Sequence, residues 1–414
     1  MLRAKDLERR DREQQEVKTL IVNCGSSSLK CGLYDVATGE RLASGRADRI
    51  GMRDAGLECK SNDKSEVQAL SLPDHAAALA SLWDAITRIM PRGEGLYAEV
   101  AGVGHRIVHG ADRFTEAIEV DQNVEAAIED LIPLAPLHNR LSLSGISAAR
   151  ELLPAARQFA VFDTAFHHTL PPAAYLYALP YEWYEKEGVR RYGFHGTSHR
   201  WVAERAAAIC PDHASKLIVC HLGAGCSTAA IRDGHSLDTS MGMTPLEGLV
   251  MATRSGDVDA GVIAFIAKQR GLEMNELEEI LNRKSGLFGI SGLSGDIQQL
   301  EQHASEGNTR AELALEMFAH RVRKYIGAHN ATLGGATAIA FTGGAGENSA
   351  SLRSRILRGL DGLGMALDPA ANARCQGREA IISTTSSPIT LLVIPTDEES
   401  VIAGEVQGLL LGAG

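Results

Sequence analysis

A pattern that occurs twice in the chain constrains its fold more than any other feature. Residues 20–35 read LIVNCGSSSLKCGLYD, and residues 217–234 read LIVCHLGAGCSTAAIRDG. Each copy has an apolar run, a polar turn with glycine, a serine, a second apolar stretch and a closing aspartate. Further strands, and then helices alternating with strands, are expected after each copy. We therefore predict a duplicated α/β unit led by a β-hairpin, whose turns direct backbone N–H groups at a shared cleft.

The expected elements follow from periodicity and from turn residues. In the first half they are strands over 17–22, 29–36, 41–48, 99–104 and 158–162 and helices over 76–90, 124–132 and 142–153. In the second half, the glycine-rich turn TGGAGENSA (342–350) follows an apolar run at 338–341 and precedes a helix over 351–360. A strand, glycine turn and helix in this order can place a phosphate or ribose against a helix N-terminus.

Composition limits the class of protein. A chain of 414 residues is long for a single core and indicates two domains. The net charge of −11 argues against a nucleic-acid binder and against a protein that binds anionic membranes. No run of 18 apolar residues occurs, so no transmembrane helix is expected. Residues 1–16 mix charges of both signs and are interpreted as a solvated extension that is not a signal peptide.

The cysteines indicate the redox compartment. The seven of them show no C-x-x-C pair and no spacing typical of a zinc site, and their number is odd. Reduced thiols in a cytoplasmic protein explain this pattern most simply. The seven positions are Cys24, Cys31, Cys59, Cys210, Cys220, Cys226 and Cys375.

The first turn points to an oxyanion ligand. Ser26, Ser28 and Lys30 offer hydroxyl groups and one positive charge directly after an apolar strand. The usual phosphate signature G-x-x-x-x-G-K-[ST] is absent from the chain. A hairpin phosphate site is therefore the interpretation of this segment.

Longer motifs resemble the acetate kinase family of the actin-like ATPase superfamily. They occur in the family's order from about residue 17 to the C-terminus. The matching segments are NCGSSSLK (23–30), GHRIVHG (104–110), LAPLHN (134–139), FDTAFHHTLP (162–171), RYGFHGTSH (191–199), HLGAG (221–225), DTSMGMTPLEGLVMATRSGDVD (238–259), KSGLFGISG (284–292), TGGAGENS (342–349) and PTDEE (395–399).

The resemblance implies a fold and a reaction. The fold is α/β, with two duplicated actin-like (ribonuclease-H-like) βββαβαβα domains and the active site in the cleft between them. The expected domains are 17–164 with 398–414, and 165–397. The implied reaction is reversible, direct in-line phosphoryl transfer from ATP to acetate, which gives acetyl phosphate and ADP. A cytoplasmic homodimer that requires Mg²⁺, or Mn²⁺ in its place, is expected.

Four side chains receive catalytic roles from the resemblance. Arg106 and Arg254, which we expect in the glycine-flanked loops GHR and TRSGD, match a substrate ligand and a transition-state stabiliser. Guanidinium groups suit both tasks because they bind carboxylate and phosphoryl oxygens bidentately. His195 matches a histidine that hydrogen-bonds the transferring phosphoryl group. Asp163 matches an essential carboxylate that orients the arginines, since acetate is already ionised at pH 7 and needs no general base.

Further residues match ligand sites of the family. Asn23 and Glu398 match the metal shell, with Glu399 as the alternative to Glu398, and His138 matches a supporting residue. The residues that match the acyl pocket are Val108, Leu137, Phe194 and Pro245, together with Arg106. Those that match the ATP site are Lys30, His221, Leu222, Gly223, Ala224, Gly225, Asp296, Ile297, Gln298, Gly344, Ala345, Gly346, Glu347 and Asn348.

The chain departs from the family pattern mainly in the nucleotide site. Ala224 replaces a common asparagine, which removes one amide contact to phosphate. Gln298 replaces an arginine near the adenine, so base selectivity is open. Ala111, Arg140 and Asp397 replace a glycine, a proline and an asparagine.

Three other functions are weighed against this assignment. A propionate or butyrate kinase would differ only in pocket width, because an extra methylene changes recognition by about 1–3 kcal/mol. A nucleotide-dependent switch would have no use for paired arginines and an acyl pocket. A Rossmann dehydrogenase is excluded because no G-x-G-x-x-G follows the first strand.

Overall fold

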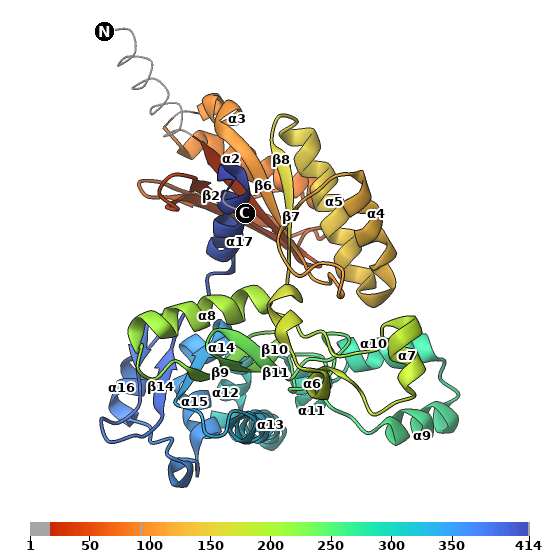
Figure 1. The fold of residues 1–414 in the computed structure, drawn as a ribbon, viewed down its shortest axis with the longest axis vertical. Helices are drawn as coiled ribbons and strands as arrows, with labels where there is room; N and C mark the ends of the chain where they lie inside the picture. The colour runs from red at the N-terminus through yellow and green to blue at the C-terminus, as the bar shows by residue number, and fades with distance from the viewer. Residues whose placement is uncertain (1–16, 92, 413–414) are drawn as a thin grey trace. The chain divides into compact units, whose positions relative to one another are not determined.

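The computed structural model describes residues 17–91 and 93–412, apart from the side chains of Glu94 and Leu137 (Figure 1). The expected extension at 1–16 lies outside this part. The chain divides into two compact units. Unit 1 contains the residues up to Ala165 and those from Asp397 onward, and unit 2 contains Phe166–Thr396. These boundaries lie one residue from the expected ones.

Unit 1 is built on a mixed sheet with strand order β5-β4-β3-β2-β1-β6-β8-β7. The hairpin β1–β2 is antiparallel, with Leu20 opposite Leu33, whereas β6 and β8 continue the sheet in parallel on the other side of β1. The strands are β1 (Lys18–Cys24), β2 (Ser28–Asp35), β3 (Arg41–Asp48), β4 (Gly56–Ser61), β5 (Ser65–Ala69), β6 (Val100–Ile107), β7 (Ile118–Glu119) and β8 (Arg157–Phe162).

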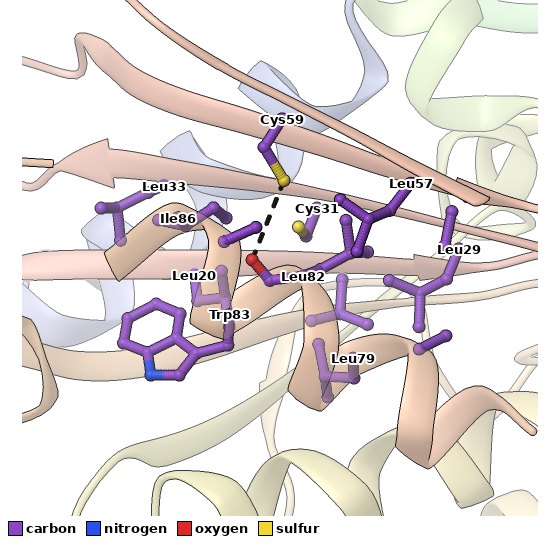
Figure 2. Close-up of a cluster of buried hydrophobic side chains, with 14 of the residues drawn as sticks. Leu20, Leu29, Cys31, Leu33, Leu57, Cys59, Leu79, Leu82, Trp83 and Ile86 are labelled. Atoms are coloured by element: carbon purple, nitrogen blue, oxygen red, sulfur yellow. Dashed lines mark hydrogen bonds between the residues drawn. The ribbon is translucent and has the colours of Figure 1, made fainter. Parts of the chain in front are cut away.

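Helices cover both faces of this sheet. On one face, α2 buries Leu79, Leu82 and Trp83 against the strands, as Figure 2 shows. Asp74 caps α2 by accepting a hydrogen bond from the amide of Ala77 at 2.8 Å. On the other face, α17 buries Ile402. The helices of the unit are α2 (His75–Ile89), α3 (Leu96–Glu99), α4 (Gln122–Asp130), α5 (Pro136–Leu152) and α17 (Glu398–Leu411).

Unit 2 has a second mixed sheet with strand order β11-β10-β9-β12-β14-β13. Its antiparallel hairpin β9–β10 again lies beside parallel strands, here β12 and β14. The strands are β9 (Lys216–Leu222), β10 (Cys226–Arg232), β11 (His235–Thr239), β12 (Ala338–Thr342), β13 (Ala380–Ile381) and β14 (Thr390–Val393).

The sheet of unit 2 also carries packed helices. Val202 and Ala206 of α8 join the core with Leu217 and Ala340, and α13 packs on β9 and β10. The helices of this unit are α6 (Pro172–Tyr175), α7 (Tyr181–Glu187), α8 (Gly196–Ile209), α9 (Ala260–Arg270), α10 (Met274–Arg283), α11 (Gly286–Ser291), α12 (Ile297–Ser305), α13 (Thr309–Thr332), α14 (Gly343–Asn348), α15 (Ala350–Leu357) and α16 (Pro369–Arg374).

The expected duplication is confirmed by the topology. The order β3-β2-β1-β6-β8-β7 in unit 1 corresponds to β11-β10-β9-β12-β14-β13 in unit 2, including a short antiparallel strand at the edge. Unit 1 adds β4 and β5, which the sequence analysis does not predict. No helix of the described part is long and apolar enough to cross a bilayer.

Two local expectations are wrong. Arg106 lies within β6 and not in a loop, because β6 continues past Gly104 to pair with β8, with Arg106 opposite Val161. The segment TGGAGENSA is not an open turn: Gly343 has φ +76°, and the short helix α14 begins there directly after β12. Arg254 lies in an irregular segment, as expected.

Candidate active site

In unit 1, Arg106 and Asp163 form a bidentate ion pair. Arg106 Nε donates to Asp163 Oδ1 at 2.8 Å, and Nη2 donates to Oδ2 at 2.6 Å. Asp163 follows the end of β8 and its side chain is only 1% exposed. A buried carboxylate is costly without a partner, and this pairing provides one. The pair therefore presents an arginine of fixed orientation.

Two acceptor oxygens approach the same guanidinium. Arg106 Nη1 lies 3.5 Å from Asn23 Oδ1 on β1 and 3.4 Å from Glu398 Oε2 at the start of α17. Helix α17 packs on β1 and β6, which is how residues from opposite ends of the chain come together. Amide and carboxylate oxygens are ligands that hard divalent cations prefer. Asn23 and Glu398 therefore fit a divalent metal ion by their chemistry.

Charge and burial oppose each other in this cluster. Burial disfavours the charged form of Arg106, but the charges of Asp163 and Glu398 outweigh it and raise the pKa of this arginine. Burial raises the pKa of Glu398, and the charge of Asp163 adds to that effect while Arg106 counters it. Arg106 therefore remains a fixed cation.

Lys30 lies near this cluster, and its charge counters the rise in the pKa of Glu398. It is an exposed residue of β2, opposite Asn23 in the hairpin register. It lines a pocket of about 160 Å³ together with Arg46, Lys60 and Glu399. The turn before β2 is closed by a hydrogen bond from the amide of Gly25 to the carbonyl of Ser28 at 2.8 Å.

In unit 2, His195 and Arg254 converge on the turn between β9 and β10. A Cβ added to Gly225 would lie 3.2 Å from Arg254 Nη2 and 3.4 Å from His195 Nε2. His195 precedes α8 with φ +56°, and its ring stacks on His221 with centroids 4.3 Å apart. His221 Nδ1 in turn pairs with Ser198 Oγ at 2.8 Å. Only glycine at position 225 leaves the space beside Arg254 Nη2 and His195 Nε2 open.

Arg254 differs from Arg106 in its partners. Its Nη1 donates to the carbonyl of Pro245 at 2.7 Å. Within the described part of the chain, no carboxylate forms an ion pair with it, and burial lowers the pKa of this guanidinium. A partly buried cation without an anion is a binding position for an anionic group.

A cavity of about 700 Å³ in unit 2 gathers three of the predicted nucleotide segments. The first is the β9–β10 turn, the second precedes and begins α12, and the third is α14. The lining residues include eight of the predicted nucleotide residues: Gly223, Ala224, Asp296, Ile297, Gln298, Gly344, Ala345 and Asn348. The volume is typical of a site for a small-molecule ligand.

Other predicted nucleotide residues serve the structure around the cavity. Glu347 Oε1 accepts from the amides of Gly343 at 2.8 Å and Thr396 at 3.0 Å, which holds the start of α14. A Cβ on Gly346 would lie 3.6 Å from the Cβ of Leu222, so these two pack against each other. Three predicted residues are therefore not among the described residues that line the cavity: Leu222, Gly346 and Glu347. The same is true of His221 and Gly225.

The predicted acyl-pocket residues are divided between the units. Val108 follows β6 in unit 1, and His138 lies with Leu137 in α5, although the side chain of Leu137 is outside the described part. In unit 2, Phe194 is 1% exposed, and Pro245 lies beside Arg254 through its carbonyl. The acyl pocket stays a prediction.

Several residues near these groups were missed by sequence analysis. Ser227 Oγ lies within hydrogen-bond distance of both His195 Nδ1 and His199 Nε2. The i, i+4 spacing of the two histidines in FHGTSH could have indicated that they share a helix face. Glu301 and Gln376 line the nucleotide-sized cavity, and Gln376 carries no motif that would have revealed it.

The fold and these groups define a class: the chain is a phosphotransferase built from two units of matching topology. The model of the acetokinase family matches residues 18–404. The chain therefore belongs to the acetokinase family, whose members transfer phosphate to a carboxyl group, and this family uses ATP or ADP as a substrate together with a divalent metal ion.

Named relatives agree with this membership. The acetate kinase of Methanosarcina thermophila is 48% identical over 397 residues, which cover 95% of this chain and 97% of the relative. The acetate kinase of Geobacillus kaustophilus is 47% identical, with 95% and 99% covered.

Solved structures give the same result for the fold. The crystal structure of Porphyromonas gingivalis acetate kinase has a TM-score of 0.87 at 42% identity and covers 95% of this chain and 100% of its own. A propionate kinase from Francisella tularensis subsp. tularensis SCHU S4 also has a TM-score of 0.87, at 38% identity, with 94% and 98% covered.

Proposed function

We propose that the chain is an acetate kinase that reversibly converts acetate and ATP to acetyl phosphate and ADP. The observation that carries this proposal is the convergence of Arg254 and His195 on Gly225, beside a turn that also lines the nucleotide-sized cavity. Two donors aimed at one point, one of them a cation without a carboxylate partner among the described residues, suit a transferring phosphoryl group.

The reaction is a single in-line displacement. A carboxylate oxygen of acetate forms a bond to the γ-phosphorus of ATP while the bond from that phosphorus to the β–γ bridging oxygen breaks. ADP leaves with the electron pair of that bond, and no proton has to be removed from acetate. Arg254 and the His195 ring stabilise the charge that spreads over the equatorial phosphoryl oxygens in the transition state.

Unit 1 supplies the remaining groups. Arg106, oriented by its two hydrogen bonds to Asp163, binds the acetate carboxylate, and Asp163 acts by fixing that orientation.

We assign the metal as Mg²⁺ bound through Asn23 and Glu398. Among the described residues, no group of three or more His, Cys, Asp or Glu side chains is placed to hold a metal ion. Mg²⁺ usually retains several waters and needs few protein ligands, so an amide and a carboxylate suffice. Bound with ATP, the metal ion supplies charge neutralisation on the phosphates.

Acid specificity is tested directly with purified protein. MgATP is combined with acetate, propionate or butyrate, and acyl phosphate is trapped with hydroxylamine. The highest kcat/KM on acetate supports the proposal. A higher value on propionate would make the chain a short-chain acid kinase, a possibility raised by the propionate kinase among the structural neighbours. Nucleotide binding without acyl phosphate from any acid would overturn the kinase assignment and favour a nucleotide-dependent switch.

Base selectivity follows from the cavity lining. Gln298 and Gln376 are exposed residues of its lining, and no arginine or lysine is among the described residues that line it. We expect weaker stacking on the base than an arginine at position 298 would give, and therefore modest discrimination between ATP and GTP. The ratio of their kcat/KM values, compared with that of Gln298→Arg, measures this effect.

We propose that the chain forms a homodimer through an exposed apolar helix, α9. Helix α9 has no buried residue, and Val262 and Phe265 are 50% and 62% exposed. The first charged residue of α9 is Lys268, so an identical copy would meet no like charge along the stretch before it. Such a surface suits a self-complementary interface around a two-fold axis.

Light scattering after size-exclusion chromatography tests the homodimer. Phe265→Glu should shift the dimer to monomer, whereas Val67→Glu, at a residue of β5 that is 76% exposed, should leave the mass unchanged. A wild-type monomer would overturn the proposal.

The cytoplasm is the proposed location. The seven cysteines are all free thiols, a state that persists in a reducing compartment. Cell fractionation with an antibody against the chain would test this assignment.

A further inference from the structure

One buried hydroxyl links two histidines in unit 2. Ser227 Oγ on β10 lies 2.9 Å from His195 Nδ1 and 2.8 Å from His199 Nε2. Ser227 and His199 are both fully buried. His195 and His199 are one helical turn apart at the start of α8, which allows both rings to reach the same oxygen.

The protons in this chain can be assigned by following donors and acceptors. Burial, together with the charges of His167, His221 and His329, lowers the pKa of His199 well below its ordinary value, so the ring is neutral and carries one proton. Within the described part of the chain, His199 Nδ1 is buried and has no hydrogen-bond partner. A buried N–H without an acceptor is costly, so the proton belongs on Nε2, which faces Ser227.

The remaining protons follow from that position. His199 Nε2–H donates to Ser227 Oγ, and the serine O–H is then directed at His195 Nδ1. His195 Nδ1 therefore acts as an acceptor, and its ring proton lies on Nε2.

The alternative arrangements each leave a buried donor unsatisfied. If His195 Nδ1–H donated to Ser227, the serine would donate to His199 Nε2 and force the proton of His199 onto its unpartnered Nδ1. If both rings donated to Ser227, the serine O–H would have no acceptor among its two partners. Either arrangement costs about 1–3 kcal/mol for the unmade hydrogen bond.

We propose that Ser227 and His199 are positioning residues that hold His195 as the neutral tautomer with its proton on Nε2. The same Nε2 lies beside Gly225, where Arg254 Nη2 also points. A donating Nε2–H complements the guanidinium toward phosphoryl oxygens, whereas the other tautomer would turn a lone pair toward them and repel them. The catalytic benefit of this tautomer rests on the proposed kinase function, but the tautomer itself can be measured without catalysis.

NMR of the wild-type protein labelled with ¹⁵N-histidine tests the tautomer directly. Correlations between ring carbon-bound protons and ring nitrogens distinguish a protonated Nε2 from a protonated Nδ1. The chain has 14 histidines, so the signal of His195 is assigned by its loss in His195→Gln. We expect a protonated Nε2 and an unprotonated Nδ1 for His195 at neutral pH. A protonated Nδ1 would overturn the proposal whether or not the protein is an acetate kinase.

Kinetics of two variants of His199 test its positioning role. The amide of His199→Gln can still donate to Ser227 in place of Nε2–H, whereas His199→Leu cannot. We expect His199→Gln to keep kcat within about threefold of wild type and His199→Leu to lose about 10- to 100-fold, with little change in the KM for acetate. Equal losses in both variants would contradict a role in proton placement.

Ser227→Ala adds a signature in the pH profile. Without the serine O–H, His195 Nδ1 is open to protonation, and an imidazolium carries an Nε2–H in any case. The kcat of Ser227→Ala should therefore approach that of wild type as the pH falls through the range in which imidazoles titrate. The titratable or charged groups that lie near His195 are His199, His221 and Arg254. A deficit that is constant with pH would indicate a merely structural loss.

Ser236→Ala is the matched control. Ser236 is also fully buried, and its Oγ pairs with Nδ1 of another buried histidine, His167, at 2.8 Å. This variant should lose comparable stability but keep the NMR signals of His195 and the wild-type shape of the pH profile. If it reproduced both changes seen with Ser227→Ala, the effect would not be specific to Ser227 and the proposal would fail. Absence of acyl phosphate formation by the wild type, with the expected NMR result, would overturn the kinase function and leave the tautomer assignment standing.

Discussion

Arg106 and Asp163 form two parallel hydrogen bonds, from Nε to Oδ1 at 2.8 Å and from Nη2 to Oδ2 at 2.6 Å. The register of the sheet creates this pairing, because β6 and β8 are parallel and Arg106 lies opposite Val161, two residues before Asp163. The carboxylate is 1% exposed and the guanidinium 17%. The orientation of the arginine thus depends on a buried partner.

Asp163→Asn should therefore damage both activity and stability. The amide can accept only one of the two hydrogen bonds and removes the carboxylate that lies nearer to Arg106, at 2.6 Å against 3.4 Å for Glu398. Removing one partner of a buried ion pair costs about 3–5 kcal/mol, which we expect in chemical unfolding. We also expect kcat/KM for acetate to fall by at least about 100-fold, measured by the hydroxylamine assay.

Glu119→Gln is the control for that prediction. Arg157 and Glu119 form a pair of the same bidentate geometry on the surface, where the side chains are 46% and 48% exposed. Exposed pairs contribute about 0–1 kcal/mol, so this variant should resemble wild type. Equal effects of the two substitutions would refute the importance of burial.

Arg254→Gln should separate stability from activity. The guanidinium has no ion-pair partner in the described part of the chain, and burial lowers its pKa, so its charge destabilises the fold. We expect the melting temperature to stay the same or rise while kcat falls by about 10³-fold or more, as for other arginines that stabilise a phosphoryl transition state. A loss of stability together with intact kcat would contradict the role assigned to Arg254.

Gly344→Leu should block the nucleotide-sized cavity without disturbing the fold. Gly344 lines the cavity, and a Cβ added there meets no atom within 4 Å. The side chain should occupy space needed by the nucleotide and raise the KM for ATP by about 10-fold or more, with the KM for acetate little changed. Gly362 likewise has open space at its Cβ but lies outside the cavity lining, so Gly362→Leu is the control. An unchanged KM for ATP in Gly344→Leu would remove the cavity as the nucleotide site.

His105 should make stability depend on pH. Burial lowers its pKa from 6.5 to about 4, although its Nε2–H donates to Gln158 Oε1 at 2.8 Å. Between these two pH values the unfolded chain binds a proton that the folded chain does not, so stability falls as the pH falls through this window. The stability lost on acidification totals about 3 kcal/mol, and none of it is lost above the unfolded pKa.

Urea unfolding of wild type and His105→Leu between pH 7 and pH 4 measures this contribution. The variant should be less stable at pH 7 because Gln158 loses a donor, but it should lose less stability on acidification. Parallel curves for the two proteins would show that His105 does not contribute to acid sensitivity.

Local patterns in the sequence were sufficient to predict much of the fold. The repeated hairpin, the alternation along β1 and β2 and the separation of strands by turn residues depend on neighbouring residues, so they are visible without coordinates. The motif order indicated the family and most of the residues that line the cavity. The strand assignment of Arg106 was missed because flanking glycines resemble a loop, whereas pairing with β8 extends the strand.

The sequence by itself therefore determined the duplicated architecture and the chemical types of the candidate site residues. Only the tertiary structure decided which of them meet within each unit: that Glu398 of α17 approaches Arg106, that three distant segments enclose one cavity, and that Ser227 joins His195 to His199. The physical reason is that local propensity acts over a few neighbouring residues, whereas contacts between distant segments are set by sheet register and by the packing of helices on the sheet.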